Sequence, residues 1–287
     1  MFLKIYKTTF KNIFRSATFW MFLALFGFIA YEILTQFSHG YYDRNLGEMI
    51  YDTDPRFVLA FQTYVKLLSN TIGSKVLFYA MPLFATVTTV LVLNRDHGDN
   101  YFGIEKAAGV KPAKYVIARL SALFTLNLIV VTIVSYLFLH LYVFTRGGVD
   151  NMELREYITD STPRMMRMII FRAVPTIVFY IGFTYCIGSL FKSGIVAAIC
   201  SIGYVIIYAA GYLMLRMRVA PTYWDYLSPT PNKLTLYFHY YDSEWFEGML
   251  QQTDTSLEKA AFCICLLTGL GIIYSLVAYI CTKVRDK

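Results

Sequence analysis

Charged residues are scarce in this chain of 287 residues: Asp, Glu, Lys and Arg together make up 16%, whereas 57% of the residues are hydrophobic. Soluble domains usually carry about 25% charged residues. The apolar residues gather in runs of about 18 or more, which are long enough to cross a bilayer core of about 30 Å. The composition therefore excludes an ordinary soluble protein and predicts an all-α integral membrane protein.

Sequence motifs for catalysis and cofactor binding are also lacking. The chain has no GxxxxGK[ST] phosphate-binding loop, no HExxH zinc motif and no GxSxG nucleophile motif. Its four histidines are scattered singly, and no two carboxylates share an apolar run. The five cysteines lie in or at the ends of apolar runs, where a disulfide framework or metal site is not indicated. We therefore expect that the chain is not an enzyme and binds no cofactor or metal.

The net charge of +7 is explained by membrane topology rather than by a nucleic-acid partner, because Lys and Arg hold loops on the cytoplasmic side. Six transmembrane helices are predicted, at 17–34, 76–93, 120–144, 169–191, 194–215 and 260–281. With the N-terminus inside, the short inner segments are about twice as basic per residue as the outer loops. We therefore expect one transmembrane domain spanning 1–287, with both termini cytoplasmic and outer loops at 35–75, 145–168 and 216–259.

The first 16 residues place four basic side chains among apolar ones at helical spacing. This pattern predicts an amphipathic N-terminal helix that lies in the membrane interface, with its cations near anionic headgroups. Its role is either that of a topology signal or that of an elbow that also contacts a partner. The following apolar run is too long for a signal peptide and has no cleavage site, so we interpret it as the first membrane span.

The outer loops 35–75 and 216–259 are rich in Tyr, Trp and Phe. Asp54 and Pro55 are typical of a helix start, and apolar residues then recur at helical spacing, so an interfacial outer helix is predicted there. The aromatic side chains form either a belt at the membrane interface or part of a lid or receptor surface.

Three polar residues fall inside predicted spans and are candidates for a substrate path: Asn127, His140 and Arg172. Intramembrane polar groups usually face a cavity or another helix rather than lipid. The alternative for His140 is a hydrogen bond to a neighbouring helix. The alternative for Arg172 is a position near the outer interface, from which its guanidinium reaches the headgroups.

The segment 94–119, NRDHGDNYFGIEKAAGVKPAKYVIAR, is the long polar stretch between the second and third predicted spans. It mixes charges with Tyr101, Phe102 and Ile104, and the charge pattern places it on the inner side of the membrane. Apolar anchors surrounded by a polar rim are typical of a protein-binding surface. The segment is therefore the predicted contact site for a soluble partner.

Within this segment Gly103 is followed nine residues later by Pro112 and then by the basic residues Lys114 and Arg119. Together with the six-span pattern and the basic leader, this spacing resembles the permease subunits of ABC-2 type ABC transporters. That family commonly has an acidic residue two positions before the glycine, where this chain has Tyr101.

The resemblance implies that the segment forms a cytoplasmic coupling helix received by a separate ABC ATPase subunit, which binds ATP and Mg²⁺. Two permease chains, as a homodimer or with a related chain, would form the path through a bacterial cytoplasmic membrane. The resemblance implies export, and the aromatic outer loops favour an amphipathic substrate such as a peptide, an antimicrobial or a lipid-like molecule. The implied coupling residues are Asp99, Tyr101, Phe102, Gly103, Ile104, Glu105, Lys106 and Pro112.

Two other classes of function remain open. A gradient-driven secondary transporter or channel would have broken spans in corresponding halves, and Pro82 and Pro175 interrupt the second and fourth spans. A membrane sensor or immunity protein that transports nothing would use the aromatic outer loops to bind a peptide.

Overall fold

The computed structural model describes residues 1–36, 41–43, 48–50, 81–98, 101–147, 173–204 and 254–284. In these ranges the protein is helical apart from one small hairpin. The named helices are α1 (Phe2–Phe14), α2 (Ala17–Gln36), α4 (Met81–Gly98), α5 (Tyr101–Ala107), α6 (Pro112–Gly147), α8 (Val174–Phe191) and α13 (Asp254–Val284). A further apolar helix spans Gly194–Tyr204.

Three helical segments of the described chain are long and apolar enough to cross a membrane: Pro112–Val134, Val174–Phe191 and Ile264–Val284. They correspond to the third, fourth and sixth predicted spans. The prediction of a helical membrane-type protein is confirmed at this level. The other three predicted spans coincide with α2, α4 and Gly194–Tyr204 as far as the structure describes them.

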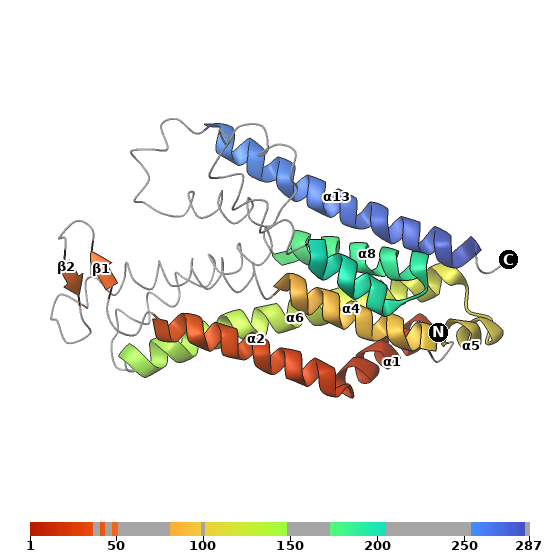
Figure 1. Ribbon diagram of the computed structural model, residues 1–287, viewed down its shortest axis with the longest axis horizontal. Coiled ribbons are helices and arrows are strands. Elements are labelled where there is room, and N and C mark those ends of the chain that lie inside the picture. Colours follow the sequence, from red (N-terminus) through yellow and green to blue (C-terminus); the bar gives the residue numbers. More distant parts are fainter. Residues whose placement is uncertain are drawn as a thin grey trace.

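The long helices lie alongside one another, as Figure 1 shows. The N-terminus, the end of α13 and the short helix α5 are all at one end of this bundle, and the strands are at the opposite end. The strands β1 (Tyr41–Asp43) and β2 (Glu48–Ile50) pair antiparallel, with Tyr41 opposite Ile50. This hairpin lies in the predicted outer loop 35–75, before Asp54, in a part of the loop for which no strand was predicted. The predicted outer helix after Asp54 lies outside the described residues.

The N-terminal helix α1 is amphipathic, as predicted. Its buried stripe consists of Ile5, Thr9 and Ile13, one helical turn apart, and this stripe packs mainly against α6. The basic residues Lys4, Lys7, Lys11 and Arg15 are exposed. The helix is thus attached to the bundle along one side and leaves its cations on the other.

Most of the polar segment 94–119 is helical, and the helices on both sides extend beyond the predicted ends of the second and third spans. Helix α4 continues to Gly98, and α6 begins at Pro112, eight residues before the predicted start of the third span at 120. Proline suits the first turn of a helix, where its missing N–H has no intrahelical partner. The early start places Tyr115 and Arg119 on a helix that packs into the core.

A two-residue turn joins α8 to the helix Gly194–Tyr204. Helix α8 ends at Phe191, Lys192 has a left-handed backbone with φ of 55°, and the next helix begins at Gly194. Gly194 faces the side chain of Asn94 so closely that a Cβ there would collide with it. The hairpin is therefore held against the last turns of α4.

Candidate functional site

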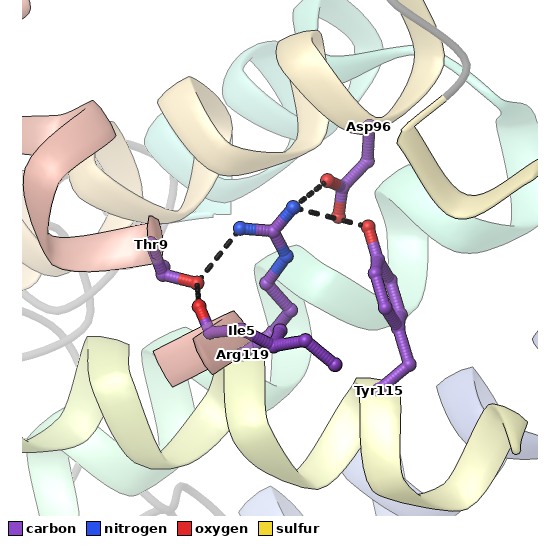
Figure 2. Close-up of polar contacts among 5 residues, drawn as sticks. All are labelled: Ile5, Thr9, Asp96, Tyr115 and Arg119. Atoms are coloured by element: carbon purple, nitrogen blue, oxygen red, sulfur yellow. Dashed lines mark hydrogen bonds and ion pairs between the residues drawn. The ribbon is translucent and has the colours of Figure 1, made fainter. Parts of the chain in front are cut away.

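Arg119 of α6 is the centre of a buried polar cluster that joins three helices (Figure 2). Its Nη2 donates to Asp96 Oδ1 of α4 at 2.7 Å, and its Nη1 donates to Thr9 Oγ1 of α1, also at 2.7 Å. The Arg119 and Asp96 side chains are only 3% and 6% exposed. An ion pair this deeply buried loses its solvation by water and is retained only with good geometry and further hydrogen bonds. We call Thr9, Asp96, Tyr115 and Arg119 the buried polar cluster.

Thr9 connects α1 to this cluster. Its hydroxyl donates to the Ile5 carbonyl oxygen one turn earlier at 2.8 Å while accepting from Arg119. The donor and an acceptor lone pair of the hydroxyl are thus both used, which fixes the orientation of the side chain. Because the contact from Arg119 is charge-assisted, it is among the stronger hydrogen bonds available to a neutral partner.

Tyr115 connects the cluster to α5. It lies one turn before Arg119 on α6, its hydroxyl accepts from Arg119 Nη2 at 3.1 Å, and the guanidinium carbon lies 5.1 Å from its ring centroid. The ring of Phe102, from α5, meets the Tyr115 ring edge to face with centroids 5.1 Å apart. Edge-to-face packing is a favoured aromatic geometry. Phe102 therefore links α5 to Tyr115 and, through it, to the buried polar cluster.

The protonation of Asp96 depends on its partner. Asp96 is in the last turn of α4, beyond the predicted span 76–93. Burial raises the pKa of its carboxyl, while the Arg119 guanidinium and the Tyr115 hydroxyl act to lower this pKa. Without Arg119, a charged carboxylate at this position would be left without its buried counter-ion. The adjacent His97 has its Nε2 3.0 Å from the Gly188 carbonyl oxygen, which links the same turn of α4 to α8.

The structure describes most of the predicted coupling residues around α5. Ile104 is 59% exposed, whereas Phe102 is partly buried against Tyr115. Gly103 and Glu105 are half-buried on α5, Lys106 is exposed, and Pro112 begins α6. Tyr101 is described through its backbone only, and Asp99 lies outside the described residues.

Of the three predicted substrate-path residues, Asn127 is the one whose side chain the structure describes. Asn127 is fully buried between α6 and α4, where its Nδ2 donates to Thr88 Oγ1 and to the Leu123 carbonyl oxygen, each at 2.9 Å. Such a bond between helices is the role expected of an amide inside a bundle. His140 is on α6 with an undescribed side chain, and Arg172 lies outside the described residues.

Sequence reasoning missed the buried polar cluster. Asp96 and Arg119 were assigned to the polar segment 94–119, and Thr9 falls in the predicted N-terminal helix within residues 1–16. The sequence did contain a signal for the ion pair. Asp96 follows the second predicted span and Arg119 precedes the third, and antiparallel helices bring two such positions to the same level. Thr9 also falls in the apolar stripe between Ile5 and Ile13, where a hydroxyl needs a partner.

The buried polar cluster can hold α1, α4 and α6 together and can transmit a displacement among them. Its chemistry is that of an ion pair and directional hydrogen bonds. Neither a scan against protein-family models nor a search of the curated proteins gives a match to this chain.

Proposed function

We propose that this chain is the membrane-spanning permease subunit of an ABC-2 type ABC transporter, with six spans and both termini in the cytoplasm. It would export an amphipathic substrate, such as a peptide or a lipid-like molecule, across a bacterial cytoplasmic membrane. ATP and Mg²⁺ would bind a separate cytoplasmic ATPase subunit, and a second permease chain would complete the path. The observation that carries the proposal is the contact of α5, through Phe102 and Tyr115, with the buried polar cluster.

The position of α5 supports this role. It lies at the end of the bundle that also holds the N-terminus and the end of α13 (Figure 1), which is the cytoplasmic end if the basic segments face inward. Phe102 turns toward Tyr115, whereas Ile104 is the large apolar side chain that stays exposed among those described on α5. Lys111 and Lys114, just after α5, are exposed as well. An apolar anchor beside cations suits an ATPase groove with an apolar floor and an acidic rim.

The buried polar cluster gives the proposal a mechanical route. A push on α5 would move Phe102 against Tyr115 and change the geometry at Arg119, which holds both Thr9 of α1 and Asp96 of α4. Packed interiors respond to such shifts by changing between discrete arrangements rather than by continuous deformation. ATP binding by the partner would thus bias how α1, α4 and α6 are arranged.

The proposal is tested by purifying the tagged full-length chain from its native membrane and measuring the ATPase activity that accompanies it. We expect a co-purifying P-loop ATPase without membrane spans of its own. Ile104→Ala should lower ATPase co-purification by about tenfold, because burying such a side chain in an interface contributes about 1.5–3 kcal/mol. Ile117→Ala is the matched control, since Ile117 is 56% exposed but belongs to α6 rather than to α5.

The proposal is contradicted if no ATPase accompanies the wild-type chain, or if Ile104→Ala and Ile117→Ala retain the ATPase equally. Membrane insertion of both variants, measured by membrane fractionation, separates a lost contact from a lost fold.

A further inference from the structure

A small cavity opens where α1 meets α4, next to Arg119. The residues that line it are Asn12, Ile13, Ser16, Leu91, Val92, Arg95 and Arg119. Its volume of about 20 Å³ is enough for one water-sized group. It is partly open, so a larger molecule could place a single atom inside while the rest of it stays at the entrance.

The polar lining of this cavity favours an anion. Arg95 and Arg119 contribute two guanidinium groups, and no acidic side chain is among the lining residues that the structure describes. Asn12 Nδ2 is buried and has no hydrogen-bond partner among the described residues. A buried N–H without an acceptor destabilises the fold by about 1–3 kcal/mol, and an acceptor atom bound in the cavity would remove this cost.

The charge balance remains positive after the ion pair is counted. Asp96 neutralises Arg119, whereas Arg95 has no ion-pair partner among the described residues and is the uncompensated cation of the cavity. The C-terminal end of α1 adds a weak negative potential, but two of its carbonyl oxygens are already used. The Phe14 oxygen accepts from Trp20 Nε1 at 2.7 Å, and the Ile13 oxygen accepts from the Ser16 N–H at 3.0 Å.

The residues around the cavity are of the kinds that are found at the level of lipid headgroups. It lies where the basic helix α1 ends and the apolar helix α2 begins at Ala17. The exposed side chains of Phe14, Arg15 and Trp20 surround this corner, and aromatic and basic residues together are typical of the membrane–water interface. Leu91 and Val92 supply an apolar wall against which an acyl chain can lie.

We propose that this cavity is a binding site for an anionic phosphate group, one of whose oxygens enters it and accepts hydrogen bonds from Asn12 Nδ2 and Arg95. The source is either the phosphodiester of an anionic phospholipid or free phosphate. Because the cavity shares Arg119 with the buried polar cluster, a bound phosphate would also pull on the residue that holds α1 to α4. The inference stands on the cavity alone and does not depend on the proposed transport function.

The test uses the full-length chain purified in a phosphate-free maltoside detergent, with its thermal unfolding followed during titration. The three additives are dioctanoyl phosphatidylglycerol, dioctanoylglycerol, which has the same acyl chains without phosphate, and inorganic phosphate. We expect phosphatidylglycerol to raise the unfolding temperature in a saturable manner and dioctanoylglycerol to have no such effect. If inorganic phosphate has the same saturable effect as the lipid, the source is free phosphate. If only the lipid acts, the source is the headgroup.

Three variants determine whether the response comes from this cavity. Arg95→Gln removes its uncompensated cation, and the isosteric Asn12→Asp replaces the unpartnered donor by a negative charge. Each should raise the additive concentration that gives half of the maximal effect by about tenfold or more, since one charge-assisted hydrogen bond is lost. Arg15→Gln removes an exposed cation from the same corner and should leave that concentration within about twofold. Equal effects of dioctanoylglycerol and phosphatidylglycerol, or equal losses in Arg15→Gln and Arg95→Gln, would overturn the proposal.

Discussion

Two helix contacts in this protein are built in opposite ways. Where α1, α4 and α6 meet, a buried guanidinium holds a carboxylate and a hydroxyl at 2.7 Å. Where α8 crosses α13, Gly182 and Gly271 let the two backbones approach so closely that a Cβ on Gly271 would lie 2.6 Å from the Val178 carbonyl oxygen. The first contact is directional and charged, and the second depends on shape and dispersion.

This difference separates the parts of the bundle that can change arrangement from those that cannot. A charge-assisted network has partners that can be exchanged, so a small shift of Arg119 can redistribute its hydrogen bonds. Glycine-mediated backbone contact has no comparable alternative, because any sliding of α8 along α13 brings larger side chains into the crossing. We therefore interpret the α8–α13 pair as the fixed part and the α1–α4–α6 cluster as the part that responds to α5.

The largest effect is expected from breaking the ion pair. Arg119→Met leaves Asp96 buried without its counter-ion, which should lower the free energy of unfolding in detergent by about 3–5 kcal/mol. Arg119→Met combined with Asp96→Leu removes both charges and should restore most of this loss, because well-packed apolar residues often replace a buried pair at little cost. A double variant as unstable as the single one would contradict the pairing.

The single variant should also show a changed dependence on pH. Burial raises the pKa of Asp96 above its ordinary value of 3.8, and Arg119→Met removes the main influence that lowers it. A carboxyl whose pKa is raised in the folded state stabilises the fold most at low pH. This stabilisation is lost as the pH rises through the pKa of the folded state. The difference in the free energy of unfolding between the wild type and Arg119→Met should therefore become smaller as the pH is lowered toward 4.

A smaller effect is expected from separating α1 from the cluster. Thr9→Val keeps the shape of the side chain but removes the acceptor for Arg119 Nη1, so stability should fall by about 1.5–3 kcal/mol. Thr132→Val is the matched control, because the Thr132 hydroxyl bonds only the Leu128 carbonyl oxygen of its own helix in the described structure. Equal losses in the two variants would show that α1 gains nothing from this bond.

The contrasting contact is tested by Gly271→Ala, which should cost about 1–3 kcal/mol through overpacking against Val178. Gly269→Ala, two residues earlier on α13, meets nothing within 4 Å and should stabilise the helix by up to about 1 kcal/mol. Thermal unfolding in detergent measures both variants. A cost for Gly269→Ala as large as that for Gly271→Ala would remove the evidence for a close crossing.

The helices could be predicted from the sequence, whereas the cluster that joins them could not. Helices α1, α8 and α13 are predicted by local patterns: a long apolar run for α8 and α13, and the helical spacing of Ile5 and Ile13 for α1. The pairing of Arg119 with Asp96 depends on how α6 and α4 are rotated and how far each extends, and this is set by packing between helices. Ile104 and Phe102 were both predicted as partner anchors, but only the relative position of α5 and α6 distinguishes the outward side chain from the inward one.

The most direct test of the account measures whether α1 moves when nucleotide binds to the partner. Spin labels would be placed at Lys4 of α1 and Val284 of α13 in a cysteine-free background, with the chain reconstituted in liposomes with its ATPase. We predict that ATP changes the distance between the labels in the wild type, and that the change is absent without the ATPase and in Arg119→Met/Asp96→Leu. The account is contradicted if the change persists in that double variant or occurs without any ATPase.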